Sequence, residues 1–207
     1  KIAMNPAMFE HEENVAIAYG MGMTAEKVAE QWKVSREDQD EFALTSHQRA
    51  LKAIESGEFT QEIAPYKVDE KRPDLITHTV HEEIAIKGTD EGPRADTSLD
   101  VLAKLRPVFA AKGSVTAGNS SQMSDGAGAV VLMSEAAMKR FNLSPLGRFV
   151  GFAVAGVPPE IMGVGPIQAI PKVLKQTGVK LDDLEWIELN EAFAAQSLAV
   201  IRDLGLD

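Results

Sequence analysis

The second half of the sequence alternates short apolar runs with helical patterns, and this alternation limits the possible folds more than any other feature. The apolar runs lie at residues 127–134, 147–157 and 185–189. Helical patterns follow them, one beginning near Ser134 and another covering residues 165–178. Strands that alternate with helices are typical of layered α/β proteins with a largely parallel sheet. The sequence therefore predicts an α/β fold class.

Helical patterns dominate the first third of the sequence. Residues 24–32 predict a helix with Thr24 as its N-cap. A second helix is predicted to begin at Ser35, which has the spacing of a capping box with Asp38, and to end at Gly57. The amino-terminal part is therefore expected to be mainly helical.

A charged and irregular stretch follows these helices. Residues 61–68 and 82–88 are short strand candidates, and residues 97–107 predict one more short helix. His78 and His81 lie in this stretch, but side chains three residues apart in an extended chain point to opposite faces. We therefore expect an exposed segment without a metal site.

Composition excludes several classes of function. The net charge is −10 and no basic cluster longer than "EKRPD" occurs, so a nucleic-acid partner is not expected. The absence of cysteine excludes disulfides and any thiolate nucleophile within these residues. No apolar run approaches the roughly 20 residues of a membrane span, and the amino terminus lacks the pattern of a signal peptide. We therefore expect a cytoplasmic protein without a membrane span.

Two polar residues, Asn190 and Glu191, stand where the last apolar run ends and an alanine-rich helix begins. Asparagine is a common N-cap, and a glutamate in the first turn complements the helix dipole. The unpaired backbone N–H groups of a helix start can equally form the floor of a binding site. The local sequence thus leaves helix capping and a functional role as alternatives.

The glycine-rich stretch at residues 113–128 matches neither of the common phosphate-binding patterns. It predicts either close packing of a turn against a strand or an approach of the backbone to a ligand. The methionines of "YGMGMTAE" and "EIMGVGP" are similarly open to two interpretations, as core residues or as the lining of an adaptable apolar pocket.

Several segments, taken in order, resemble the thiolases. They are "YGMGMTAEKVAEQWKVSREDQDEFALTSHQRA", "LAKLRPVF", "VTAGNSSQMSDGAGAVVLMS", "IMGVGPIQAI" and "LNEAFAAQ". The sequence is most similar to the bacterial 3-ketoacyl-CoA thiolase and acetyl-CoA acetyltransferase type, over nearly the whole chain. The resemblance implies two similar layered α/β halves, with a mainly helical loop domain inserted in the first. Residues 1–112 would form the loop domain, residues 113–145 the end of the amino-terminal half, and residues 146–207 the start of the carboxy-terminal half.

The resemblance also implies a reaction. Thiolases cleave 3-ketoacyl-CoA with free CoA to acetyl-CoA and a shortened acyl-CoA, or run the reverse condensation, through an acyl-cysteine. CoA and acyl-CoA would be substrates, with no tightly bound cofactor, and the protein would be a homo-oligomer, a dimer or a tetramer. The family's nucleophilic Cys belongs before Lys1, and its His and second Cys belong after Asp207. The chain is therefore expected to be an internal fragment that is inactive alone.

Individual roles follow from the same resemblance. Asn190, in "NEAF", would orient a water that helps to form an oxyanion hole for the acetyl-CoA enolate. Ser121, in "GNSSQ", matches a serine that meets the pantetheine arm of CoA, and Arg94, in "GPRADTS", falls near an arginine that contacts its phosphate or adenine. Gly20 stands where relatives carry a His, so a CoA contact is not expected there. The residues expected at the pantetheine and acyl tunnel are Met21, Met162 and Phe193.

Two other functions stay open at this point. Ketoacyl synthases share the overall fold, but they generally carry a His where Asn190 stands and use a carrier protein. A non-catalytic CoA-binding or interaction module is the second alternative, because the chain contains no cysteine. Incubation with 3-ketoacyl-CoA and CoA would separate an enzyme from such a module.

Overall fold

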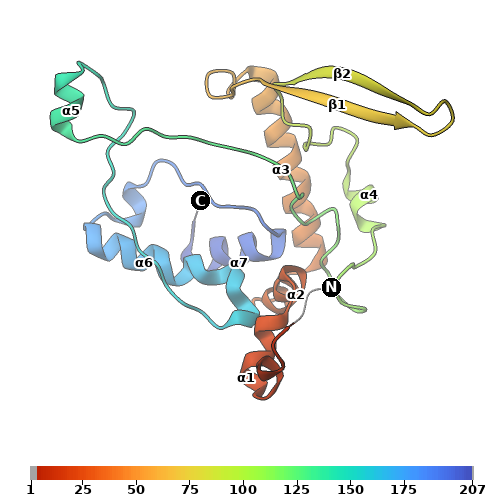
Figure 1. Cartoon of the computed structure of the whole chain (residues 1–207). Coiled ribbons are helices and arrows are strands. Elements are labelled where there is room, and N and C mark those ends of the chain that lie inside the picture. The colour runs from red at the N-terminus through yellow and green to blue at the C-terminus, as the bar shows by residue number, and fades with distance from the viewer. Residues whose placement is uncertain (1–3, 207) are drawn as a thin grey trace.

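The computed structural model describes residues 4–206 of the chain (Figure 1). Within these residues, helices make up most of the regular structure and a two-stranded sheet makes up the rest. No helix in this range has both the length and the apolar composition needed to cross a membrane. In chain order the elements are η1 (Pro6–Phe9), α1 (Glu12–Val15), η2 (Ala16–Ala18), α2 (Met21–Gln31), α3 (Arg36–Ser56), β1 (Tyr66–Asp74), β2 (Thr79–Lys87), α4 (Leu99–Ala103), α5 (Glu135–Arg140), η3 (Pro159–Val164), α6 (Gly165–Thr177), η4 (Leu181–Asp183) and α7 (Ala194–Leu204).

Helix α3 is the longest element, with α2 near its amino end and the β1–β2 hairpin near its carboxyl end (Figure 1). Ser35 Oγ accepts a hydrogen bond from Asp38 N at 3.0 Å, and Asp38 Oδ2 accepts one from Ser35 N at 3.3 Å. At the other end Gly57 has a φ of 78°, a left-handed conformation that glycine adopts without strain. The predicted capping box and the predicted helix end are both confirmed.

Helix α2 begins earlier than the sequence predicted, at Met21, with Gly20 as its N-cap. The prediction that Thr24 is the cap is wrong, because Thr24 lies inside the helix and its Oγ1 donates to Met21 O at 2.7 Å. Gly22 is buried, and a Cβ atom at this position would overlap the Phe109 ring. This close approach of an aromatic ring explains why a glycine stands in the first turn of the helix.

The core forms where α2, η3 and α7 meet. Val28, Val34, Val164 and Ala199 are buried and make one apolar cluster. Ile167, in α6, packs against this cluster. The core therefore joins residues from the first and the last quarter of the chain.

The other predicted helices are present, with shifted ends. Ser134 Oγ accepts a hydrogen bond from Ala137 N at 3.2 Å, and Ser134 is the N-cap of α5. Helix α6 matches the predicted helix closely and ends at Gly178, whose φ is 72°. Helix α4 is shorter than predicted and covers Leu99–Ala103.

The charged stretch forms an antiparallel hairpin that projects from the carboxyl end of α3 (Figure 1). Tyr66 pairs with Lys87 at its base, and Asp74 pairs with Thr79 next to the turn. His78 lies in that turn with a φ of 56°. The structure has two exposed strands in this stretch, as predicted, but β1 shares only residues 66–68 with the predicted strand at 61–68, and β2 starts three residues before the predicted strand at 82–88.

The three apolar runs of the second half do not form strands, contrary to the prediction (Figure 1). Residues 127–134 and 147–157 are largely exposed, with Val131 at 84% and Phe152 at 72%. A strand requires backbone hydrogen bonds to a neighbouring strand, and no segment within residues 4–206 pairs with these runs. The apolar pattern therefore identified three apolar segments, but it contains no information on the neighbouring strands that they would need.

Candidate functional site

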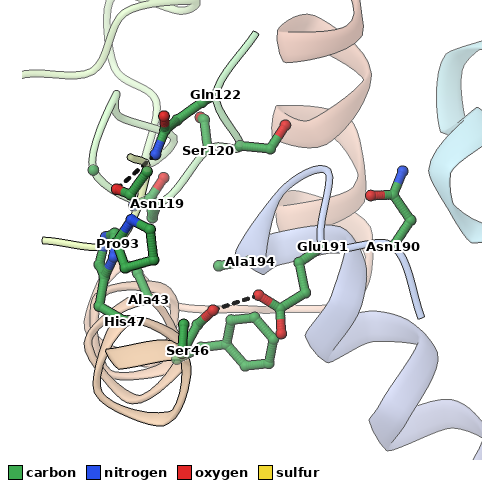
Figure 2. Close-up of a pocket in the computed structure, with 15 residues that line it drawn as sticks. Ala43, Ser46, His47, Pro93, Asn119, Ser120, Gln122, Asn190, Glu191 and Ala194 are labelled. Carbon is green, nitrogen blue, oxygen red and sulfur yellow. Dashed lines mark hydrogen bonds between the residues drawn. The ribbon is translucent and has the colours of Figure 1, made fainter. Parts of the chain in front are cut away.

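A cleft of about 300 Å³ lies between α3, the glycine-rich loop and the start of α7 (Figure 2). Most of its polar groups are hydroxyls and amides, and Glu191 contributes a carboxylate. The residues that line the cleft are Phe42, Ala43, Ser46, His47, Ala50, Gly92, Pro93, Gly118, Asn119, Ser120, Ser121, Gln122, Asn190, Glu191 and Ala194.

One face of α3 forms the first wall. Ser46 and His47 each lie three or four residues from both Ala43 and Ala50, so the four residues share one side of the helix. Ser46 Oγ donates to Glu191 Oε2 at 2.6 Å, which ties this wall directly to the segment before α7 (Figure 2).

The glycine-rich loop forms the second wall and is held by Asn119, which is 3% exposed. Asn119 Oδ1 accepts from Thr116 N at 2.8 Å, and Asn119 Nδ2 donates to Asp40 Oδ1 at 3.0 Å. Asp40, in α3, also accepts from Arg36 Nε at 2.7 Å through its other oxygen. The loop is thus fixed to α3 by a buried, charged hydrogen-bond network.

The turn before α7 forms the third wall. Ser121 N donates to Ala192 O at 3.0 Å, and Ala194 N donates to Asn119 O at 3.0 Å. A single antiparallel β-bridge also links Ser120 to Phe193. The glycine-rich loop and the turn before α7 therefore hold each other in place, although they lie about 70 residues apart in the sequence.

Asn190 does not cap α7, so the capping alternative is wrong. The helix begins at Ala194, and its N-cap is Phe193, which makes no side-chain cap hydrogen bond. Asn190 lies on the exposed chain before the turn, and in Figure 2 its amide points away from Ser46 and carries no hydrogen bond to the other residues drawn. It also borders a second hollow of about 660 Å³ beside α6. The amide is therefore free to meet a ligand or a water at the edge of the cleft.

The three apolar residues expected at a tunnel do not line the cleft. Phe193 lies beside it, and its ring packs edge-to-face against Phe109 with the ring centroids 6.0 Å apart. Phe109 also lies against Gly22, so the start of α2 is close to this aromatic pair. Met21, the first residue of α2, directly precedes Gly22. Met21 and Met162 are 55% and 51% exposed. The structure thus brings the Phe109–Phe193 pair close to the start of α2, and Met162 lies in η3, which packs against α2.

Arg94 lies at the rim. Its backbone N donates to His47 Nδ1 at 3.2 Å, while its guanidinium donates to both carboxylate oxygens of Asp96, at 3.1 and 2.9 Å. The hydrogen bond and the charge of Arg94 lower the pKa of the Asp96 carboxyl, and those of Asp96 raise the pKa of Arg94. Arg94 therefore carries its charge next to the cleft, paired with a carboxylate in this conformation.

The cleft is suited to a polar, largely uncharged chain. Hydroxyls and amides offer donors and acceptors for amide groups of a ligand. Within the described range no group of three or more His, Asp or Glu side chains is placed to hold a metal.

Ser46, His47 and the Asp40–Asn119 pair were not predicted as site residues. A sequence signal for the first two exists, because their spacing with Ala43 and Ala50 places small and polar residues on one helix face. No local signal indicates the Asp40–Asn119 pair, whose members are 79 residues apart.

The chain is similar to several characterised proteins. Two family profiles match it, the thiolase N-terminal domain over residues 7–136 and the thiolase C-terminal domain over residues 143–207. It is 52% identical over 192 residues to the 3-ketoacyl-CoA thiolase of Bacillus subtilis (strain 168), in a match that covers 90% of this chain and 48% of that protein.

Solved structures give the same result. The acetyl-CoA acetyltransferase of Bacillus anthracis matches with a TM-score of 0.84 and 49% identity, over 90% of this chain and 45% of that one. The dimeric peroxisomal thiolase of Saccharomyces cerevisiae matches with a TM-score of 0.86 and 42% identity, over 100% of this chain and 49% of that one. The chain spans about half the length of these relatives. The predicted α/β fold class is confirmed by these matches.

Proposed function

Because this chain belongs to the thiolase family, we propose that it is the middle portion of a CoA-dependent acyltransferase. The enzyme would cleave 3-ketoacyl-CoA with CoA to acetyl-CoA and a shortened acyl-CoA, or run the reverse condensation. The relatives support this proposal through their names, which include 3-ketoacyl-CoA thiolase and acetyl-CoA acetyltransferase.

One observation carries the proposal beyond family membership: Ser121 and Asn190 line the same cleft. They lie 69 positions apart in the sequence, and the Ser121 N to Ala192 O hydrogen bond links their two segments. In this proposal the Ser121 hydroxyl contacts the amide-rich pantetheine arm. The Asn190 amide orients a water toward the thioester oxygen, where negative charge develops in the transition state.

The other CoA contacts proposed are Arg94, Met21, Met162 and Phe193. Arg94 would contact a phosphate or the adenine, with Asp96 holding its guanidinium in place until the ligand arrives. The Phe193–Phe109 pair and Met21 offer an apolar wall that suits the methylene groups of an acyl or pantetheine chain.

The covalent step needs a nucleophile that these 207 residues do not contain, since the chain has no cysteine. Ser46 does not replace it, because its hydroxyl donates to Glu191 and no histidine bridges the pair as a relay base would. We therefore expect the 207-residue chain to bind CoA thioesters without turning them over.

The test is a comparison of two proteins. A longer protein that carries these residues and a cysteine nucleophile should convert acetoacetyl-CoA and CoA to acetyl-CoA. The loss of the ultraviolet absorbance of acetoacetyl-CoA would measure this conversion. The 207-residue chain should show no turnover. Absence of turnover in the longer protein would refute the proposed reaction, and turnover by the short chain would refute the need for an external nucleophile.

A non-catalytic CoA-binding module is the second candidate function. The observation that favours it is the presence of a cleft in a chain without a nucleophile. It is supported if the longer protein binds CoA but fails the turnover test. The proposals of a homo-oligomer and of a cytoplasmic location rest on the family and on sequence composition.

A further inference from the structure

The geometry points to Asp40 as a positioning residue for the proposed reaction: it fixes Ser121 and the turn that follows Asn190 relative to α3 without touching the substrate. This inference rests on the proposed function for its kinetic consequences. Its structural basis is the buried network that joins Arg36, Asp40 and Asn119.

Asp40 lies on the buried side of α3 and is 4% exposed. Each of its carboxylate oxygens accepts one hydrogen bond, Oδ2 from Arg36 Nε and Oδ1 from Asn119 Nδ2. The Arg36 guanidinium is held in turn by Leu102 O at 2.6 Å and Leu105 O at 3.0 Å. The charge is therefore balanced and both oxygens are satisfied, which a buried carboxylate requires.

Asn119 transmits this fixed position to both sides of the cleft. Its side chain holds the loop through Thr116 N, and two residues later that loop presents Ser121. Its backbone O accepts from Ala194 N, at the first residue of α7. A shift of Asn119 relative to α3 would therefore move Ser121 and the turn that follows Asn190 together.

The role requires one carboxylate and one amide, paired as acceptor and donor at positions 40 and 119, rather than merely side chains of this size. In Asp40→Asn, the side chain keeps one oxygen, while Arg36 Nε and Asn119 Nδ2 both still need an acceptor. The new amide N–H group therefore faces one of these two donors and cannot bond to it. In Asn119→Asp, two carboxylates would face each other where a 3.0 Å hydrogen bond now lies. Each single change thus breaks the link with almost no change in volume.

The reciprocal double variant restores the pairing. With Asp40→Asn and Asn119→Asp together, the oxygen at position 40 can accept from Arg36 while its amide donates to the new carboxylate at position 119. The second oxygen of that carboxylate can still accept from Thr116 N. The net charge of the network is unchanged, and only the 3.3 Å contact from Asn119 Nδ2 to Ser114 O is lost.

The experiment measures kcat and KM for acetoacetyl-CoA cleavage, and amide hydrogen exchange, in the longer protein that carries these residues. We expect Asp40→Asn to lower kcat by about 10- to 100-fold, the effect of a misplacement of about 1 Å. Amide exchange at Ser121 and Ala194 should become about tenfold faster or more, and the double variant should recover both quantities to within about threefold. Val28→Ala serves as the control, because it destabilises the apolar core and leaves the network intact.

The outcomes separate positioning from stability. If Asp40→Asn and Val28→Ala, compared at equal fractions folded, retain the same kcat, Asp40 is only structural and the inference is overturned. A double variant no better than the single variants would overturn it as well. If the wild-type protein shows no thiolase activity, the proposed function fails, while amide exchange at Ser121 and Ala194 still decides whether Asp40 fixes the two segments.

Discussion

Replacement of Asn190 by alanine should slow the proposed reaction and leave the protein as stable as before. A helix cap and an oxyanion-hole donor can occupy the same position in a sequence, and the two roles have different consequences. In the structure Asn190 is not a helix cap, because α7 begins at Ala194 and its N-cap is Phe193.

The expected change in stability is therefore small. Loss of a cap costs about 1 kcal/mol, whereas an exposed side chain away from caps and cores contributes within about ±0.5 kcal/mol. The melting temperature of Asn190→Ala should then change by no more than about 2 °C. Loss of one oxyanion-hole contributor lowers kcat by about 10²–10³, which corresponds to about 2.7–4 kcal/mol of transition-state stabilisation.

The assay compares kcat and the melting temperature of Asn190→Ala with those of the wild type in the longer protein. Asn190→Asp is the matched control, since it keeps the size of the side chain and loses the amide donors, and it should be slowed at least as much. A normal kcat in the alanine variant would refute the oxyanion role. A slow variant that also melts several degrees lower would show that the residue supports the fold after all.

Three further predictions concern the rest of the chain. Arg94→Ala should raise the Kd for CoA in the longer protein by roughly 3- to 10-fold at low salt, as calorimetry can measure, whereas the control Arg140→Ala in helix α5 should leave this Kd unchanged. A Kd for Arg94→Ala equal to that of the wild type would show that Arg94 does not contact CoA. Asp38→Asn should lower the free energy of unfolding by about 0.2–1 kcal/mol at pH 7, because the hydrogen bond from Arg202 lowers the pKa of the Asp38 carboxyl below its ordinary value of 3.8. That difference should be present above the unfolded-state pKa and disappear as the pH falls through the lowered pKa of the folded state, so an equal effect in urea unfolding at pH 7 and at about pH 2 would contradict the ion pair. The exposed apolar run at residues 127–134 should make the 207-residue chain self-associate, and a protease-resistant monomer in size-exclusion chromatography would count against this prediction.

Features that depend on neighbours in the sequence were predicted well. The capping box at Ser35 and Asp38 and the helix end at Gly57 are decided within one turn of helix, and both are confirmed. The family was also recognised correctly, because its motifs are contiguous segments.

Predictions that depend on distant contacts failed in an informative way. Thr24 was expected to begin α2, but the helix starts at Met21, and the Phe109 ring lies against Gly22 in its first turn. Asn190 was expected as a possible cap, yet the contacts of Ser120 and Ser121 with the turn keep the chain extended until Phe193. In both cases a remote segment packs against the start of the helix, and no local pattern contains that information.

The proposed site roles remain predictions. The structure places Ser121 and Asn190 at one cleft, Arg94 at its rim and Phe193 beside it, and Met162 does not line this cleft.

The contact between Ser46 and Glu191 has a consequence for the order of events during protein synthesis. The two residues are 145 positions apart, so α3 leaves the ribosome long before the segment that completes the cleft. At about 5–20 residues per second, the delay is roughly 7–30 s. During that interval the face of α3 that carries Ser46 has no partner from the segment before α7, and a nascent-chain chaperone has time to bind it. Slower translation between these two positions would lengthen the exposure without changing a single amino acid.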